Sequence, residues 1–329
     1  MKTSSRFLIS IGICVGMLLV YNVAILVTAR SSQRHHMLTV LDQLPPSTDC
    51  IFLGNSLVEA GCDVATFNAA WPAPDSAPTL IPANLALGAT TPVEHCVILK
   101  RALNKPLPLK FLIYGFFDDQ LNVPPKGNWS DLVGNRAFSY YFPSEAASLY
   151  APGSRLKKWE LTITGHIPML AERSSLWGKV ESIRRSFEQI GMPRQKVNRF
   201  GRVEDFAALE SKDVASFIDR CDSVVHENRG FSLAVRRIID LGHERGARVI
   251  LVEMPMPSRH RKVFYSTAAW AELRSHLQLL ARRENAIYLP ASDWVKDDQK
   301  FEDATHLNEE GARLFSTQLA SAIFGISSL

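Results

Sequence analysis

The sequence predicts an α/β protein built around a parallel β-sheet whose two faces are covered by helices. Short apolar runs of strand length alternate with longer segments of helical periodicity, and several of the apolar runs end at a glycine. Strands that are apolar on both sides are typical of parallel sheets enclosed between helices. The composition agrees with a globular core, since 46% of the 329 residues are hydrophobic and 21% are charged.

Five segments have the character of buried strands. The first ends at the Gly54-Asn55 turn, the second at Gly88 and the third at Gly115. In an open parallel sheet, ligands bind at the carboxyl ends of the strands, so we expect the loops after the first three strands to meet at one site. The predicted strands are Asp49–Leu53, Pro82–Leu87, Leu109–Tyr114, Arg248–Glu253 and Ala286–Leu289.

Helices are predicted between and after these strands. Asn308 is a good N-cap for the last helix, because Glu309 and Glu310 then stand in its first turn, beside the positive end of the helix dipole. Residues 119–230 break the alternation of strands and helices, which predicts a long and partly helical insertion. The other predicted helices are Val93–Leu103, Phe231–Glu244 and Ala268–Arg283.

The N-terminal segment is strongly apolar. Residues 7–28 are 22 residues without a charge, and about 20 helical residues cross the core of a bilayer. We predict an uncleaved single-pass anchor in the cytoplasmic membrane over residues 1–30, a linker over 31–48 and a domain over 49–329. A cleaved signal peptide is the alternative, because Val27-Thr28-Ala29 resembles a cleavage site. Both interpretations put the domain outside the cytoplasm.

The net charge and the cysteines indicate which binding partners and cofactors to expect. A net charge of +4 gives no reason to expect a nucleic acid partner. Residues 155–202 contain eleven Lys or Arg against four Glu, which suits an anionic polymer or lipid headgroups, or is an ordinary solvated helix surface. Cys50 and Cys62 are either disulfide-bonded or small buried side chains. No Cys/His spacing of a zinc site occurs, so neither a metal nor a cofactor is predicted.

Three residues have the chemistry of nucleophilic catalysis. A serine hydroxyl attacks only when a base removes its proton and a third group orients the base. Ser56 follows the first strand, and Asp303 and His306 lie three residues apart just before the last helix. This spacing lets the carboxylate bind Nδ1 of the imidazole and leaves Nε2 facing the serine. The backbone N–H groups of Ser56 and Gly88 are predicted to bind the oxyanion.

These blocks resemble those of the SGNH (GDSL-like) hydrolases. Gly54-Asn55-Ser56 is similar to the family's first block, Gly88 to the glycine of its second, and Asp303-Ala-Thr-His306 to its last. The resemblance implies a flavodoxin-like, three-layer α/β/α sandwich with a five-stranded parallel sheet. It also implies a Ser-His-Asp triad that acts on esters without a cofactor.

The chain departs from this family at two positions. Asn55 stands where the first block has Asp, and Phe117 stands where the third block has an Asn that donates to the oxyanion. The site then uses only backbone donors, or takes a donor from Asp119, Gln120 or Asn122 through a shift in the loop. Because losing one such donor costs about 10²–10³ in rate, weak hydrolysis or none is one expectation. The candidate pocket residues are Asn55, Asp118, Asp119 and Asn122, with His95 and Glu253 as further candidates near the site.

Three functions agree with these residues. The first is an extracytoplasmic esterase or O-acyltransferase that acts on an acyl ester of a cell-envelope glycan or polymer. This type resembles the anchored partners of multi-pass membrane acyltransferases. The second is a lipase or small-ester hydrolase in which the insertion forms an acyl pocket. The third is a catalytically weak scaffold in polymer assembly, which the phenylalanine at position 117 suggests. Hydrolysis and transfer use the same triad, so the sequence does not separate them.

Overall fold

The computed structural model of the chain describes residues 2–28, 33–72, 80–122, 143–150, 154–167, 184 and 211–327. The chain divides into two compact units. One unit comprises residues 1–39 and 135–193, and the other comprises residues 40–134 and 194–329. The second unit contains every strand of the sheet and every candidate site residue.

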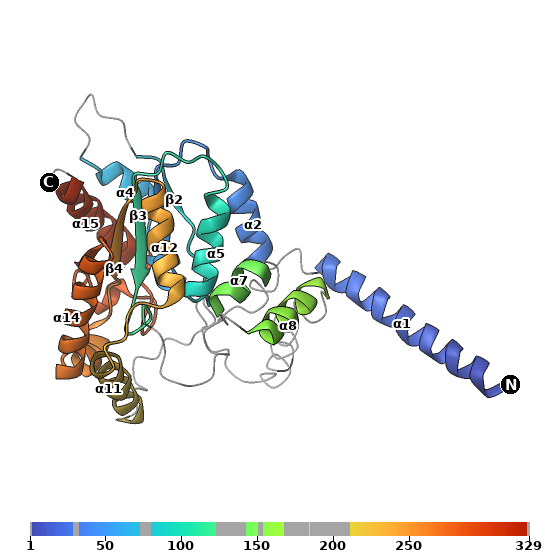
Figure 1. Cartoon of the computed structure of the whole chain (residues 1–329). Helices are drawn as coiled ribbons and strands as arrows, with labels where there is room; N and C mark the ends of the chain where they lie inside the picture. The colour runs from blue at the N-terminus through green and yellow to red at the C-terminus, as the bar shows by residue number, and fades with distance from the viewer. Residues whose placement is uncertain are drawn as a thin grey trace, which may run out of the picture. The chain divides into compact units, whose positions relative to one another are not determined.

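The second unit is built on a five-stranded parallel sheet with the strand order β2-β1-β3-β4-β5. Strands β2, β3 and β4 of this sheet are labelled in Figure 1. The predicted α/β class and the five parallel strands are therefore confirmed. Strand β2 is shorter than predicted, because beyond Asn84 only single backbone hydrogen bonds continue its contact with β1. The strands are β1 (Cys50–Leu53), β2 (Pro82–Asn84), β3 (Phe111–Phe116), β4 (Arg248–Glu253) and β5 (Ile287–Pro290).

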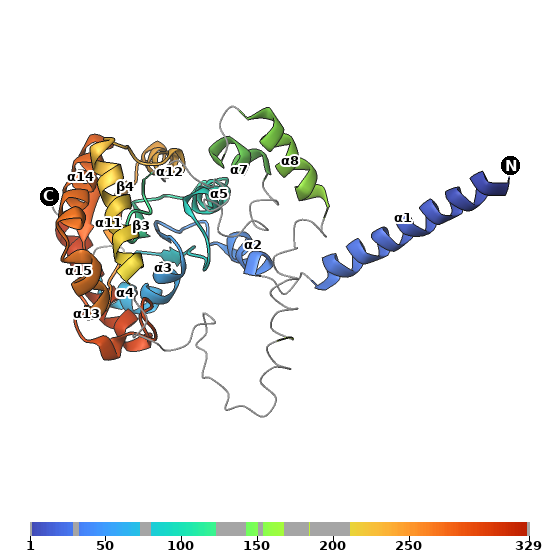
Figure 2. The same cartoon turned by 90° about the horizontal axis from the view of Figure 1, so that it is seen from below.

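Helices cover both faces of this sheet. On one face, α3 (Ser56–Gly61), α4 (Val64–Ala70) and α15 (Glu309–Ser327) pack together. On the other face, α5 (Pro92–Ala102) packs against α12 (Leu233–Glu244), and α14 (Ala268–Arg283) lies against β5. Figure 2 shows α5 and α12 on one side of the strands, with α3 and α4 on the other side.

Two glycines allow α3 to lie directly on the sheet. A Cβ atom at Gly54 would lie 2.4 Å from Val58 Cγ2, and a Cβ atom at Gly115 would lie 2.3 Å from the same atom. Any side chain at either position would displace Val58, together with the helix that begins at Ser56. The glycines that end β1 and interrupt β3 therefore fix the position of the candidate nucleophile.

The structure describes further helices. In the predicted insertion at 119–230, much of which lies outside the described residues, the structure describes α7 (Pro143–Tyr150), α8 (Arg155–His166) and α11 (Ser211–His226). The rest are α1 (Lys2–Thr28), α2 (Gln33–Gln43), α13 (Ser258–His260), the π-helix Arg261–Tyr265 and the 3-10 helix Asp298–Lys300.

Two predictions from the N-terminal half have different outcomes. The predicted transmembrane helix within residues 1–30 is not found: among the described residues, no helix is both long enough and apolar enough to cross a membrane. Cys50 and Cys62 are free thiols in the hydrophobic core beside α3, so the structure has small buried side chains where a disulfide was the alternative.

Candidate active site

Ser56, His306 and Asp303 form one hydrogen-bonded chain. Nε2 of His306 lies 2.8 Å from Oγ of Ser56, although the two residues are 250 positions apart in the sequence. Nδ1 of His306 lies 2.9 Å from one carboxylate oxygen of Asp303 and 2.8 Å from the other. His306 and Asp303 are both buried, whereas Ser56 is partly exposed. Only the serine end of the chain is therefore open to a substrate.

The carboxylate of Asp303 determines which nitrogen of His306 carries the proton. Burial disfavours the charged form of Asp303, but hydrogen bonds from the His306 ring and from the backbone N–H groups of His306 and Thr305 outweigh it. The pKa of Asp303 is consequently held well below its usual value. An ionised carboxylate accepts the Nδ1–H proton of a neutral imidazole, so Nε2 is left to accept the hydroxyl proton of Ser56.

The loop that carries Asp303 and His306 is closed at its base. Phe301 and Leu307 form an antiparallel bridge, and the Glu302 N–H donates to the His306 carbonyl at 2.8 Å. Asn308 caps α15 as predicted, since its side chain accepts from the Gly311 N–H at 3.0 Å. The loop is thus tied at one end to the first turn of α15.

Asn55 has a structural contact that explains its place beside the nucleophile. It is the N-cap of α3, and its side chain accepts a hydrogen bond from the Leu57 N–H at 3.0 Å. An Asn is as good an N-cap as an Asp, which accounts for the departure from the usual first block. Asn55 was predicted as a pocket residue, which stays a prediction. Its observed contact is the cap of the helix that begins at Ser56.

Asn84 connects α3 to the sheet, a role that the sequence did not predict. Its side chain donates to the Cys62 carbonyl at 3.1 Å and to the Val58 carbonyl at 3.3 Å, and it accepts from the Ala86 N–H at 3.0 Å. An amide side chain at the end of an apolar strand, four residues before Gly88, was the available signal.

Gly88 lies in a turn beside the loop that carries Ser56. The Leu85 N–H donates to the Phe52 carbonyl at 2.8 Å, and the Leu87 N–H donates to the Gly54 carbonyl at 3.1 Å. The chain thus follows the end of β1 until it reaches Gly88, which is buried. The structure therefore brings the two predicted oxyanion donors into neighbouring loops.

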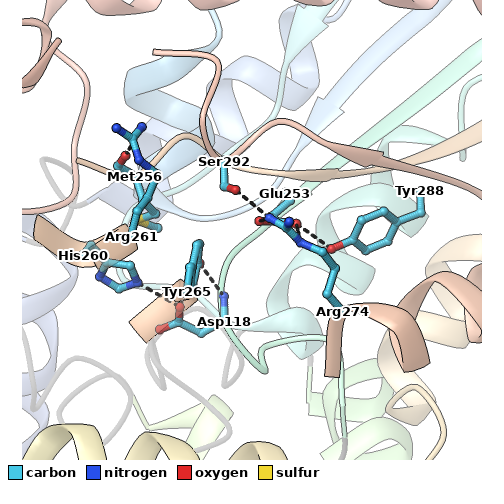
Figure 3. Close-up of polar contacts among 9 residues, drawn as sticks. All are labelled: Asp118, Glu253, Met256, His260, Arg261, Tyr265, Arg274, Tyr288 and Ser292. Atoms are coloured by element: carbon cyan, nitrogen blue, oxygen red, sulfur yellow. Dashed lines mark hydrogen bonds and ion pairs between the residues drawn. The ribbon is translucent and has the colours of Figure 1, made fainter. Parts of the chain in front are cut away.

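Asp118 is turned toward the segment that follows β4 (Figure 3). Its Oδ1 accepts from the Tyr265 hydroxyl at 2.9 Å and lies 3.1 Å from Nε2 of His260. Tyr265 stacks on Trp270 with ring centroids 4.1 Å apart, and burial raises its pKa well above the usual value. Asp118 therefore holds the chain after β3 against the chain after β4.

The other candidate pocket residues also have partners outside the triad. Asp119 forms an ion pair with Arg220 of α11 at 3.2 Å. Asn122 donates to the Gly230 carbonyl at 3.3 Å, and its backbone bridges to Phe231. The two adjacent carboxylates at 118 and 119 thus contact different elements, as expected for a polar cluster at a strand end.

Glu253 was predicted at the rim of the site, but its side chain is fully buried (Figure 3). It accepts from Arg274 Nε at 3.0 Å and from the Tyr288 hydroxyl at 2.6 Å. Arg274 also donates to Ser292 Oγ at 2.9 Å, which joins β4, α14 and the loop after β5. Buried carboxylates require such partners, so Glu253 has a structural role.

Two further positions bear on the oxyanion side of the site. Phe117 is half-buried and packs against the hydrophobic core of the α3 face, so its ring takes an apolar role where the resemblance implied an amide donor. His95 was a candidate to line the pocket, but it is completely buried and contacts Thr90 and Tyr114.

Comparison with known proteins gives similarity in solved structures only. No family model matches the chain, and no curated protein matches it significantly. A lipase/acylhydrolase from Enterococcus faecalis is 12% identical, with a TM-score of 0.34, over 85% of this chain and 96% of that chain. A carbohydrate acetylesterase from Sinorhizobium meliloti is 12% identical, with a TM-score of 0.33, over 85% of this chain and all of that chain (100%). Similarities this low establish no activity.

Proposed function

We propose that the chain is a serine-dependent ester hydrolase or acyltransferase. The observation that carries this proposal is the chain of short contacts from Ser56 Oγ through both ring nitrogens of His306 to the buried carboxylate of Asp303. A serine that only begins a helix does not require a buried imidazole beside its hydroxyl. Nor does it require a carboxylate that binds the second nitrogen of that imidazole.

The reaction proceeds in two halves. Oγ of Ser56 attacks the acyl carbonyl as Nε2 of His306 takes the hydroxyl proton, and the negative charge moves to the carbonyl oxygen. The N–H groups of Ser56 and Gly88 stabilise this oxyanion. The intermediate collapses as His306 returns the proton to the leaving alkoxide, which leaves an acyl-Ser56 ester. Water or an acceptor hydroxyl then attacks that ester as Nε2 of His306 takes its proton. The bond between the acyl carbon and Oγ of Ser56 breaks, His306 returns the proton to Oγ, and the acid or the new ester leaves.

The identity of the acceptor stays a prediction. Transfer to a cell-envelope glycan, a multi-pass acyltransferase partner and a site outside the cytoplasm were predicted from the sequence, as was an anionic polymer as ligand. Most of the basic range 155–202 lies outside the described residues. A lipase or small-ester hydrolase uses the same steps with water as the acceptor. Rates on acetate, butyrate and palmitate esters of 4-nitrophenol separate a short-chain enzyme from a lipase.

The test is covalent labelling of the nucleophile. A fluorophosphonate should label Ser56 of the wild-type protein, and the Ser56→Ala variant should lose both the label and the hydrolysis of 4-nitrophenyl acetate. Ser316→Ala is the matched control, because Ser316 is a buried serine of α15 that contacts Gly61 and Asp63 near the same helix. Equal labelling or equal turnover of wild type and Ser56→Ala would refute Ser56 as the nucleophile.

A further inference from the structure

Three buried polar side chains form a chain behind the Gly88 turn. The hydroxyl of Tyr114, on β3, lies 2.9 Å from Nδ1 of His95, on α5. Nε2 of His95 lies 2.8 Å from Oγ1 of Thr90, and Thr90 Oγ1 donates to the carbonyl of Leu87. Tyr114 and His95 are fully buried and Thr90 nearly so. These three side chains therefore connect the centre of the sheet to the backbone of the Gly88 turn.

Only one direction of proton donation satisfies every donor and acceptor in this series of hydrogen bonds. The carbonyl of Leu87 can only accept, so the single hydroxyl proton of Thr90 is used there. Nε2 of His95 must then donate to Thr90, and Nδ1 must accept from the Tyr114 hydroxyl. A neutral imidazole has one donor and one acceptor nitrogen, and burial lowers the pKa of His95 to about 3, so the ring is neutral.

The end of the chain is the peptide group that contains the candidate oxyanion donor. The Leu87 carbonyl and the Gly88 N–H belong to the same planar trans peptide, so they point in opposite directions. A hydrogen bond that fixes the carbonyl on the protein side therefore aims the N–H to the other side. Successive hydrogen bonds also polarise one another, which makes the Gly88 N–H a stronger donor.

The backbone here needs such support. Ala89, directly after Gly88, has φ +57°, a left-handed conformation that residues with a side chain rarely adopt. The Leu87 N–H donates to the Gly54 carbonyl on the β1 side, while the Thr90 hydroxyl closes the turn over the Leu87 carbonyl. The Leu87–Gly88 peptide is thus fixed at both of its flanks.

We propose that Tyr114, His95 and Thr90 are positioning residues that orient the Gly88 N–H toward the carbonyl oxygen of an ester bound at Ser56. This inference rests on the proposed function and deepens it. With Phe117 in place of an amide donor, stabilisation of the oxyanion depends on backbone N–H groups. The hydrogen-bonded relay formed by Tyr114, His95 and Thr90 supplies the rigidity that the Gly88 N–H requires.

The test removes one oxygen atom from the relay. Thr90→Val preserves the shape of the side chain and removes the donor to the Leu87 carbonyl. We expect kcat on 4-nitrophenyl acetate to fall roughly 10- to 100-fold with KM changed by less than about twofold, because the lost interaction acts in the transition state. Affinity for butylboronic acid, which forms a tetrahedral adduct with a serine, should fall by about the same factor as kcat.

Two further variants make the result specific. Thr91→Val is the matched control: its hydroxyl bonds Glu94 in the first turn of α5, so the same substitution one residue later weakens the helix cap and leaves the relay intact. We expect Thr91→Val to keep kcat. Tyr114→Phe removes the first donor of the relay and should lower kcat with KM unchanged, which tests the relay even where Thr90→Val does not fold.

The outcomes separate the relay from the proposed function. Full kcat and full boronate affinity in folded Thr90→Val or Tyr114→Phe would overturn the relay, and so would an equal loss of kcat in Thr91→Val. Activity that survives Ser56→Ala would overturn the proposed function, and the relay with it.

Discussion

Replacement of Asp303 by Asn tests the triad through the tautomer of His306. In the structure, one carboxylate oxygen of Asp303 accepts from the backbone N–H groups of Thr305 and His306, each at 2.8 Å. That same oxygen lies 2.9 Å from Nδ1 of His306, and the other oxygen lies 2.8 Å from it. An Asn side chain can keep the two backbone bonds through its single oxygen. Its NH₂ group then faces Nδ1 where an acceptor stood.

The expected loss follows from the proton count. An NH₂ donor opposite Nδ1 favours the tautomer with the proton on Nε2, and a protonated Nε2 cannot accept the hydroxyl proton of Ser56. This wrong tautomer costs about 10⁴ in kcat, or ~5.5 kcal/mol of transition-state stabilisation. KM should change by less than about threefold, because Asp303 is buried and does not contact the substrate. The free energy of unfolding should fall by about 1.5–3 kcal/mol, the contribution of one hydrogen bond to a charged group.

The assay compares Asp303→Asn with Asp63→Asn. Asp63 caps α4 through a 2.6 Å bond from the Thr66 N–H, and Asn caps helices as well as Asp does. We therefore expect Asp63→Asn to keep both kcat on 4-nitrophenyl acetate and stability against urea. A kcat for Asp303→Asn within about tenfold of wild type would refute the reasoning, because the tautomer would then not control the rate.

The pH dependence of stability gives the same substitution a second readout. The pKa of Asp303 is lower in the folded chain than in the unfolded chain, so its stabilisation is complete above the unfolded pKa of about 4. That stabilisation is lost as the pH falls through the folded pKa. The difference in urea stability between wild type and Asp303→Asn should therefore be constant from about pH 6 to 8 and shrink below about pH 4. A difference that grows toward low pH would contradict this assignment.

Two other substitutions test the elements around the site. Gly115→Ala puts a Cβ atom 2.3 Å from Val58 Cγ2, so we expect a loss of about 1–3 kcal/mol in urea unfolding and at least ~10-fold in kcat as α3 moves; full stability would contradict the close packing. Glu253→Gln leaves Arg274 without its buried counter-charge. Since the Arg274 side chain is 34% exposed and can turn to water, we expect a loss of about 1–3 kcal/mol, below the 3–5 of a fully buried pair, with kcat retained. A loss of kcat without a loss of stability would contradict a structural role for Glu253.

The strands could be predicted from sequence because most are short apolar runs. Burial explains this for β1, β3 and nearly all of β4, whereas β2 and β5, at the two ends of the sheet, are only partly buried. Their observed ends differ by a few residues, as between the predicted Leu109–Tyr114 and the observed Phe111–Phe116. The helix Ser56–Gly61 was missed, because six residues are too few to show a helical period. Its existence depends on the Asn55 cap and on the two glycines beneath it, which are tertiary features.

The triad and its surroundings differ in how far the sequence reveals them. Asp303 and His306 lie on one loop, so their spacing in the sequence is enough to predict that they interact. Asp118 contacts His260 and Tyr265, which are 142 and 147 residues away. No local pattern contains that information, so the sequence could not predict these contacts of Asp118.

His95 shows the same limit at the oxyanion side of the site. A lone histidine on an amphipathic helix is compatible with a core position or a pocket position, and its two contacts lie on separate elements. What decides its role is the set of hydrogen-bond partners around it. The Leu87 carbonyl accepts the Thr90 proton, so Nε2 of the imidazole donates to Thr90 and Nδ1 accepts from the tyrosine hydroxyl. A site that has Phe117 in place of an amide donor depends more heavily on the direction of a backbone N–H. The apolar side chain at residue 117 and the proposed relay behind Gly88 therefore concern one physical requirement, a fixed donor for the oxyanion.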